Sequence, residues 1–135
     1  MANPELYVLF PGCAREALAR YAEIFGGEVW LNTYGEFGRA DGPPDAIAHG
    51  GVSGPVSLSG SNAGPGEEPV RMAGLMISLL GTDEPGTLHR WFEALAEGGE
   101  VLDPLQPRPW GDTDGQVRDR FGLRWLIGYQ GSAQD

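Results

Sequence analysis

The sequence contains no lysine, one cysteine (Cys13) and only two histidines, His49 and His89. The lack of lysine excludes a Schiff-base lysine, a Ser–Lys dyad and a lysine-based phosphate loop. A single cysteine excludes an internal disulfide and a zinc site built from several thiolates. All nine basic residues are arginine, against 19 acidic residues, which gives a formal net charge of −10. Because binding to phosphates needs a basic stripe, this balance argues against nucleic acid as a partner.

Long hydrophobic runs are also missing. No apolar stretch of the sequence approaches the roughly 20 residues that a membrane-spanning helix needs. The first residues, Met1–Glu5, lack the basic-then-apolar order of a secretory signal. We therefore expect a cytoplasmic protein without membrane contacts. The acidic surface favours solubility, and it would also attract cationic ligands.

What the sequence does contain is a repeat. Gly26–Val29 recurs as Gly98–Val101, 72 residues later. Each copy follows a stretch with the apolar spacing of an amphipathic helix lying on a core. The apolar positions of the two stretches are Ala14, Ala17, Leu18, Tyr21, Ala22 and Phe25, and then Leu88, Trp91, Phe92, Leu95 and Ala96. A Gly-Gly pair after each stretch suits the left-handed residue that closes a helix.

Extended segments surround both predicted helices. A strand is expected before each helix, a Val-rich strand after it, and two further strands beyond. The expected strands are Leu6–Phe10, Ala46–Val52 and Val56–Ser59, and then Leu75–Leu80, Gly115–Arg118 and Leu123–Ile127, with Leu58 aligned on Leu126. Residues 1–65 and 70–135 thus form two βαβββ modules joined by a Gly- and Pro-rich linker. The sequence predicts a single α+β domain in which the tandem modules form a curved mixed sheet around a cleft.

Several motifs accompany the repeat. They include Tyr7–Gly12 before the first helix, Ile47–His49, Trp110–Asp112 and Asp119–Trp125. With the paired modules, they resemble the vicinal-oxygen-chelate superfamily, and more closely its PhnB-like branch. The superfamily includes glyoxalase I, extradiol dioxygenases and bleomycin-resistance proteins. The resemblance covers nearly the whole chain and implies the glyoxalase/bleomycin-resistance fold. It also implies pairing of chains, so we expect a homodimer.

The resemblance implies a divalent metal held by four side chains, two from each module. The corresponding positions in this sequence are Leu6, Ser57 or Leu58, Leu75 and Leu126. None of these residues is His, Glu, Gln or Asp, the types that supply lone pairs to such a metal. We therefore expect no divalent metal and no other cofactor.

His49 is the first candidate for ligand contact or acid–base chemistry. It lies in a predicted strand between Ile47 and Val52. Facing the cleft, it can orient a ligand or transfer a proton near neutral pH. Bonded within the sheet, it is structural. His89 lies on the polar side of the second helix, four residues before Glu93, and is expected to face solvent.

Aromatic and charged residues supply the other candidates. Trp110, held by its Pro and Gly neighbours, either stacks on a flat or cationic ligand or packs at a module or dimer contact. Arg124 alternates with Trp125 and either faces the cleft or forms a surface salt bridge. Trp91, Phe92 and Trp125 are predicted to lie in the core. The predicted ligand-binding residues are Tyr34, His49, Ser57, Trp110, Asp112 and Arg124, and the only candidate for catalysis is His49.

Two functions remain open from the sequence. The first is metal-independent binding of a small cationic or aromatic molecule in the cleft, by sequestration as in drug resistance. The second is a glyoxalase- or dioxygenase-like lyase or isomerase that uses His49 or a non-standard metal site. The sequence does not decide whether the protein is an enzyme.

Overall fold

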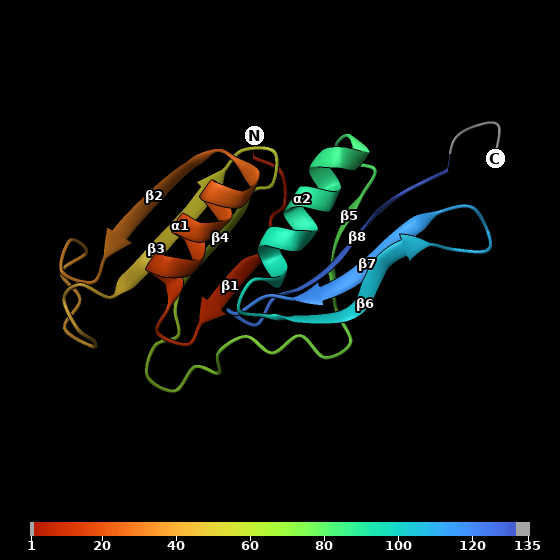
Figure 1. Ribbon diagram of the computed structural model, residues 1–135. Helices are drawn as coiled ribbons and strands as arrows, with labels where there is room; N and C mark the ends of the chain where they lie inside the picture. The colour runs from red at the N-terminus through yellow and green to blue at the C-terminus, as the bar shows by residue number, and fades with distance from the viewer. Residues whose placement is uncertain (1, 132–135) are drawn as a thin grey trace. The chain divides into compact units, whose positions relative to one another are not determined.

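The computed structural model describes residues 2–131, and the chain divides into two compact units, Met1–Val70 and Arg71–Asp135. Each unit has the order strand, helix and three strands (Figure 1). The first unit contains β1 (Tyr7–Phe10), α1 (Ala14–Phe25), β2 (Glu28–Thr33), β3 (Ile47–Ser53) and β4 (Leu58–Asn62). The second contains β5 (Ile77–Leu80), α2 (Pro85–Ala96), β6 (Glu100–Pro107), β7 (Thr113–Arg118) and β8 (Arg124–Tyr129). The predicted α+β class and the βαβββ repeat are confirmed.

Each unit pairs its four strands in a mixed sheet of its own. The strand order is β1-β4-β3-β2 in the first sheet and β5-β8-β7-β6 in the second. In both, the first strand pairs in parallel with the last, and the other pairs are antiparallel. The two units therefore have the same topology. None of the helices within residues 2–131 is long and apolar enough to cross a membrane.

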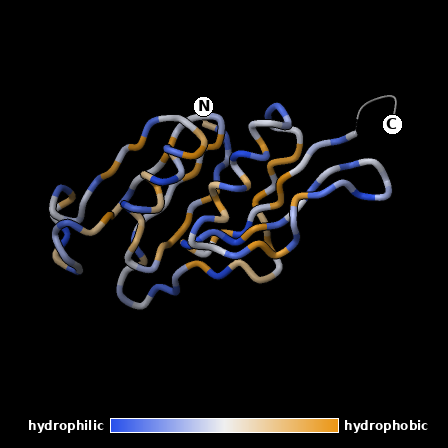
Figure 2. Tube along the Cα trace, in the orientation of Figure 1, coloured by the Kyte–Doolittle hydropathy of each residue, from blue (hydrophilic) through white to orange (hydrophobic). Residues whose placement is uncertain are grey.

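One helix packs on one face of each sheet. Strand and helix residues that face each other are buried, such as Phe10 and Leu18 in the first unit and Leu88 and Trp125 in the second. Buried and less buried residues alternate along β1 and β7, and Figure 2 shows apolar and polar segments mixed along the trace of both units. Trp91 and Phe92 also lie in this core, as predicted. The core thus occupies the space between helix and sheet, and the opposite face of each sheet carries the remaining side chains.

The helix ends follow the predicted Gly-Gly pairs, and the second glycine of each pair has a further role. Gly26 and Gly98 adopt positive φ angles of 82° and 73°, as the end of a helix requires. A Cβ on Gly27 would lie 2.3 Å from the Ser53 carbonyl oxygen, and one on Gly99 would lie 2.3 Å from the Arg118 carbonyl oxygen. The repeated second glycine therefore allows β2 and β6 to start directly against the neighbouring strand.

The fourth strand of the first unit begins later than predicted, at Leu58 instead of Val56. The Ser57 hydroxyl accepts a hydrogen bond from the Gly54 N–H (3.1 Å) and donates one to the Gly54 carbonyl (3.2 Å). These two bonds hold residues 54–57 in a turn, which delays the strand.

The predicted alignment of Leu58 with Leu126 is wrong by one residue. Leu58 pairs with Val52, and both are buried beneath α1. Leu126 is half-buried and pairs with Ser78 and Gln116 on the face opposite α2. On the face opposite the helix, Tyr7 of β1 pairs with Ser59 of β4, and Ser78 of β5 pairs with Leu126 of β8. Ser59 is therefore the residue of the first unit that corresponds to Leu126. Strand alternation explains the error, because a slip of one residue moves a side chain to the other face.

Candidate functional site

The face opposite α1 carries a cluster of aromatic side chains from three strands. Tyr7 pairs with Ser59, Ser59 with Gly51, and Gly51 with Trp30. Residues that oppose each other across strands point to the same side of a sheet. His49, two residues before Gly51, shares that side. We call Tyr7, His49 and Trp30 the aromatic row.

The aromatic row is held by contacts between its own members. The Tyr7 hydroxyl and His49 Nδ1 share a hydrogen bond of 3.0 Å, and the two rings stack with centroids 5.6 Å apart and an interplanar angle of 11°. Trp30 meets the His49 ring at 67°, with centroids 4.8 Å apart. Tyr7 is 47% exposed and Trp30 is 38% exposed. These rings therefore form a continuous surface that a ligand can reach within this unit.

Gly51 explains how Trp30 reaches His49. A Cβ on Gly51 would lie 2.7 Å from Cζ2 and 2.8 Å from Cε2 of Trp30. The indole therefore lies over the bare backbone of β3 instead of standing beside it. Ser59, the next residue in this cross-strand line, donates its hydroxyl to the Glu5 carboxylate over 3.1 Å. One carboxylate thus lies close to the same face.

A cavity of about 430 Å³ adjoins the aromatic row, since Tyr7 lines it. Tyr34, buried to 3% exposure, forms another part of its wall. The Arg39 guanidinium lies 4.1 Å from the centre of the Tyr34 ring and bonds Asp41 at 2.6 Å and 3.0 Å. These bonds lower the pKa of Asp41 below its ordinary value. Arg39 is thus held between Tyr34 and Asp41.

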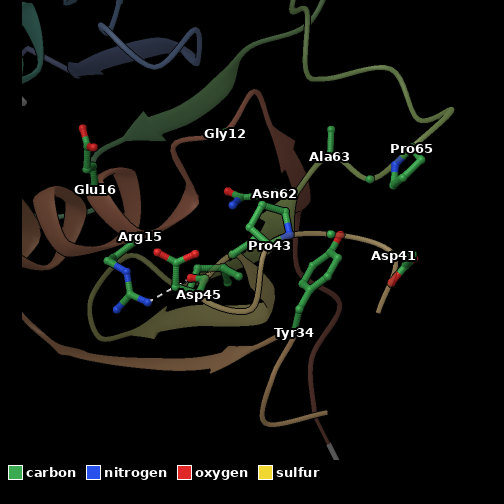
Figure 3. Close-up of a pocket in the computed structure, with 14 residues that line it drawn as sticks. Gly12, Arg15, Glu16, Tyr34, Asp41, Pro43, Asp45, Asn62, Ala63 and Pro65 are labelled. Carbon is green, nitrogen blue, oxygen red and sulfur yellow. Dashed lines mark hydrogen bonds between the residues drawn. The ribbon is translucent and has the colours of Figure 1, made fainter. Parts of the chain in front are cut away.

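A second cavity of the first unit, about 620 Å³, lies where α1 begins (Figure 3). Its walls come from the first turn of α1, the loop between β2 and β3, and the end of β4. Asn62 accepts a hydrogen bond from the Ala14 N–H (2.9 Å) and so caps α1 from the neighbouring strand. Arg15 donates to the Asp45 carbonyl at 3.2 Å. The lining includes three carboxylates, of Glu16, Asp41 and Asp45, and one guanidinium.

The face opposite α2 carries ion pairs where the first unit has rings. Arg108 donates to Asp114 (2.8 Å) and Asp103 (2.7 Å), and these bonds raise the pKa of Arg108. Arg124 donates to the Gln116 side chain (2.6 Å) and to the Ala73 carbonyl (2.9 Å). Arg124 does lie on the face opposite Trp125, as its alternation predicts, and its guanidinium is engaged within its own unit.

Trp110 and Asp112 lie in the loop that joins β6 to β7. The Arg108 N–H donates to the Asp112 carbonyl at 2.7 Å and closes this hairpin. Trp110 is 68% exposed at its tip. Asp112 lines a cavity of about 410 Å³ together with Leu80 and Leu126. Trp110 and Asp112 are thus close in the chain, and Arg124 lies at the other end of β8.

The remaining predicted residues differ in their surroundings. Ser57 uses its hydroxyl in the turn before β4 and does not join His49 on the aromatic row. His89 is half-buried, not solvated as predicted, because its Nε2 shares a 2.9 Å hydrogen bond with the Tyr129 hydroxyl. Tyr7 and Trp30 were not among the residues predicted from the sequence. Alternation of Tyr7 with the core residue Val8 was the available signal for Tyr7, whereas Trp30 depends on Gly51.

The residues at the expected metal positions do not fit a divalent metal. Leu6 and Leu75 precede β1 and β5, outside the strands. The residues on the face opposite the helix that pair with the last strand are Tyr7 with Ser59 in the first unit and Ser78 with Leu126 in the second. These supply neutral hydroxyls and an alkyl group, and two of the hydroxyls already bond His49 and Glu5. Within residues 2–131, no three His, Cys, Asp or Glu side chains are grouped to hold a metal ion. Metal analysis of the purified protein remains the test of this expectation.

Comparison with known proteins agrees with this architecture. Protein PA1353 from Pseudomonas aeruginosa is 31% identical, with a TM-score of 0.80 over 98% of this chain and 100% of that one. The PhnB protein from Bacillus cereus is 18% identical, with a TM-score of 0.80 over 95% of this chain and 99% of that one. Protein YjdN from Escherichia coli K12 is 27% identical over 90% of both chains. The sequence model of the Glyoxalase/Bleomycin resistance protein/Dioxygenase superfamily matches residues 6–127, and this chain belongs to that superfamily.

Proposed function

We propose that this protein binds a small, flat and cationic molecule on the aromatic row of its first module, without a divalent metal. The supporting observation is the contiguity of Tyr7, His49 and Trp30, which are mutually held, accessible and adjacent to a cavity. Flat cations are attracted to aromatic faces, by about 0.5–2 kcal/mol for each ring. The function is sequestration of a ligand, of the drug-resistance type.

Charge supports a cationic ligand. Residues 1–70 include three arginines and nine acidic residues. Of the three arginines, Arg39 is bonded to Asp41 and Arg15 to the Asp45 carbonyl, so both guanidinium groups are already partly engaged. Glu5 lies beside the aromatic row through Ser59. An anionic ligand would meet a net negative surface there.

A matched pair of probes tests this proposal. The 1-methylquinolinium cation and the quinoline-2-carboxylate anion have the same ring system and opposite charge. We expect the cation to bind and to shift the NMR signals of Tyr7, Trp30 and His49, and the anion to bind at least tenfold more weakly. Trp30→Leu removes one aromatic face and should weaken cation binding about tenfold. Trp110→Leu, the same change in the second module, serves as the control.

Two results would contradict the proposal. One is equal binding of both probes, because the surface would then select rings without regard to charge. The other is equal loss with Trp110→Leu and Trp30→Leu, which would move the stacking surface to the second module.

A second candidate function follows from the Tyr7–His49 hydrogen bond. An imidazole ring that is oriented by a hydrogen bond at one of its nitrogens is typical of a general base. An isomerase or lyase reaction by His49 is therefore the alternative. His49→Gln would abolish such an activity, while the binding proposal requires only a modest loss of affinity. Stoichiometric bound metal whose removal abolishes an activity would favour the enzyme and contradict metal-free binding.

We also propose a homodimer. Edge strands with exposed apolar residues favour pairing between chains. Val101 on β6 is 45% exposed, and β6 is an edge strand of its sheet. Light scattering at micromolar concentration should give twice the mass of the chain, and a monomer would contradict this part of the proposal.

A further inference from the structure

The second module contains a cavity with a chemical character of its own. It measures about 410 Å³, within the range of roughly 300–1,000 Å³ of small-molecule sites. It lies where β5 and β8 end and β7 begins. Its lining comprises Leu80, Gly81, Asp112, Thr113, Asp114, Leu126, Tyr129 and Gln130.

Two leucines give this cavity an apolar side. Ser78 pairs with Leu126 and Leu80 pairs with Gly128, so Leu80 and Leu126 are diagonal neighbours on the face opposite α2. Both leucines line the same cavity. Leu80 is 51% exposed and Leu126 is half-buried. An alkyl chain that covered both leucines would remove apolar surface from water.

The carboxylates of the cavity are not neutralised by its own lining. Asp112 and Asp114 are its charged residues, and the lining includes no arginine. Asp114 bonds Arg108, which also bonds Asp103, so this trio carries one net negative charge. Within residues 2–131, the Asp112 carboxylate has no hydrogen-bond or ion-pair partner. A cation is therefore the charge that this wall would attract.

Leu126 also marks the disagreement with the superfamily. The resemblance implies a metal donor at this position, and leucine has no lone pair to give. We infer that the second module uses this place to bind an amphiphilic amine, with the alkyl chain on Leu80 and Leu126 and the ammonium group at Asp112 and Asp114. The alkyl chain then covers the position at which leucine cannot bind a metal, and the ammonium group lies beside it at the two carboxylates. This site does not depend on the aromatic row of the first module.

Three probes of equal chain length test the inference on the full chain. They are n-hexylammonium, hexanoate and hexan-1-ol, each followed by two-dimensional NMR and by calorimetry. We expect hexylammonium to shift the methyl signals of Leu80 and Leu126 and to bind more tightly than hexanol. Hexanoate should bind most weakly. Binding of hexylammonium should weaken when the salt concentration rises, because exposed charges are screened.

Asp112→Asn removes the unpaired charge and keeps the shape of the loop. It should weaken hexylammonium binding about three- to fivefold and leave hexanol unchanged. Leu126→Asn should weaken both probes. Glu93→Gln, the same change of charge on the exposed side of α2, is the matched control and should have no effect.

The inference is overturned if the three probes bind equally or if Glu93→Gln weakens binding as much as Asp112→Asn. It is also overturned if the shifts are confined to Tyr7, His49 and Trp30, since the amine would then bind to the aromatic row. Failure of the quinolinium experiment, by contrast, leaves these results unaffected. The two proposals are thus tested separately.

Discussion

The two modules have the same strand order and the same helix position, yet they differ on the face opposite the helix. In the first module that face carries rings that contact one another over β1, β2 and β3. In the second it carries Arg108 and Arg124, each bonded to polar groups of its own sheet. The helix side is apolar in both. The comparison teaches that the repeated fold depends on the core side, and that the opposite face was free to acquire different chemistry.

The modules also differ in how they close the turn before the last strand. In the second, the Asp119 carboxylate is buried and accepts hydrogen bonds from the Phe121 and Leu123 N–H groups and from the Trp125 indole. In the first, the exposed Ser57 hydroxyl accepts a hydrogen bond from the Gly54 N–H. A buried acceptor with three donors is worth more than a solvated hydroxyl.

The largest expected effect therefore belongs to Asp119→Ala. It leaves three donors unpaired in a buried turn and should lower the free energy of unfolding by about 3–5 kcal/mol. Ser57→Ala, its counterpart in the first module, should cost less than about 1 kcal/mol. Urea unfolding followed by tryptophan fluorescence measures both. Equal losses would break the distinction between the two turns.

The second prediction concerns the second glycine of the repeated Gly-Gly pair, which has the same close contact in both modules. Gly27→Ala and Gly99→Ala each push a Cβ against a backbone carbonyl oxygen that cannot move freely. Each should destabilise the protein by about 2 kcal/mol or more. Thermal unfolding of the two variants should give similar losses. A large loss for one glycine only would show that the repeated motif has different roles in the two modules.

A smaller effect is expected from the cap of α1. Asn62→Ala removes the acceptor of the Ala14 N–H and should cost about 1 kcal/mol, as for other capping residues. In the second module, Tyr129 occupies the corresponding end of β8 and bonds His89 instead. Tyr129→Phe should cost about as much, and hydrogen exchange should show the loss near α2. Loss of protection near α1 in Asn62→Ala and near α2 in Tyr129→Phe would sharpen the comparison.

The smallest effect is a response to acid in the loop after β2. The pKa of Asp41 is lowered by its bonds to Arg39, and the pKa of Glu36 is lowered by its bond to the Thr33 N–H. A carboxylate with a lowered pKa stabilises the folded loop above its unfolded pKa, and that contribution is lost as the pH falls through the folded value. NMR signals of Tyr34 should therefore shift below the ordinary range of aspartate, about pH 4. Asp41→Asn should remove most of this shift, and an unchanged titration would contradict the role of the Arg39 pair.

The sequence predicted the parts of the fold that depend on local patterns. Apolar spacing located both helices, and the Gly-Gly pairs located their ends. It misplaced β4 because the Ser57 turn uses side-chain bonds that no hydrophobic pattern records. The sequence alignment paired Leu58 with Leu126 because the two residues are identical, although their side chains lie on opposite faces of their sheets. Strand pairing was needed to separate them.

The site was less predictable than the fold. His49 was a candidate from its strand, but its partners depend on register: Tyr7 reaches it across β4, and Trp30 reaches it over Gly51. Arg124 was placed on the correct face, but its bond to the Ala73 carbonyl joins residues that are distant in the sequence. Such contacts arise from long-range pairing, which a single sequence does not reveal.

The parallel pairing of first and last strand has a consequence for how the chain folds. In the first module β1 pairs with β4, the strand that emerges last, and α1 receives its cap from Asn62 at the end of that strand. β1 can therefore pair with β4 only after almost the whole module has been synthesised. Long-range closure of this kind is slow compared with helix formation. Because all its strands precede Val70, the first module can nevertheless complete its sheet while the second is still on the ribosome.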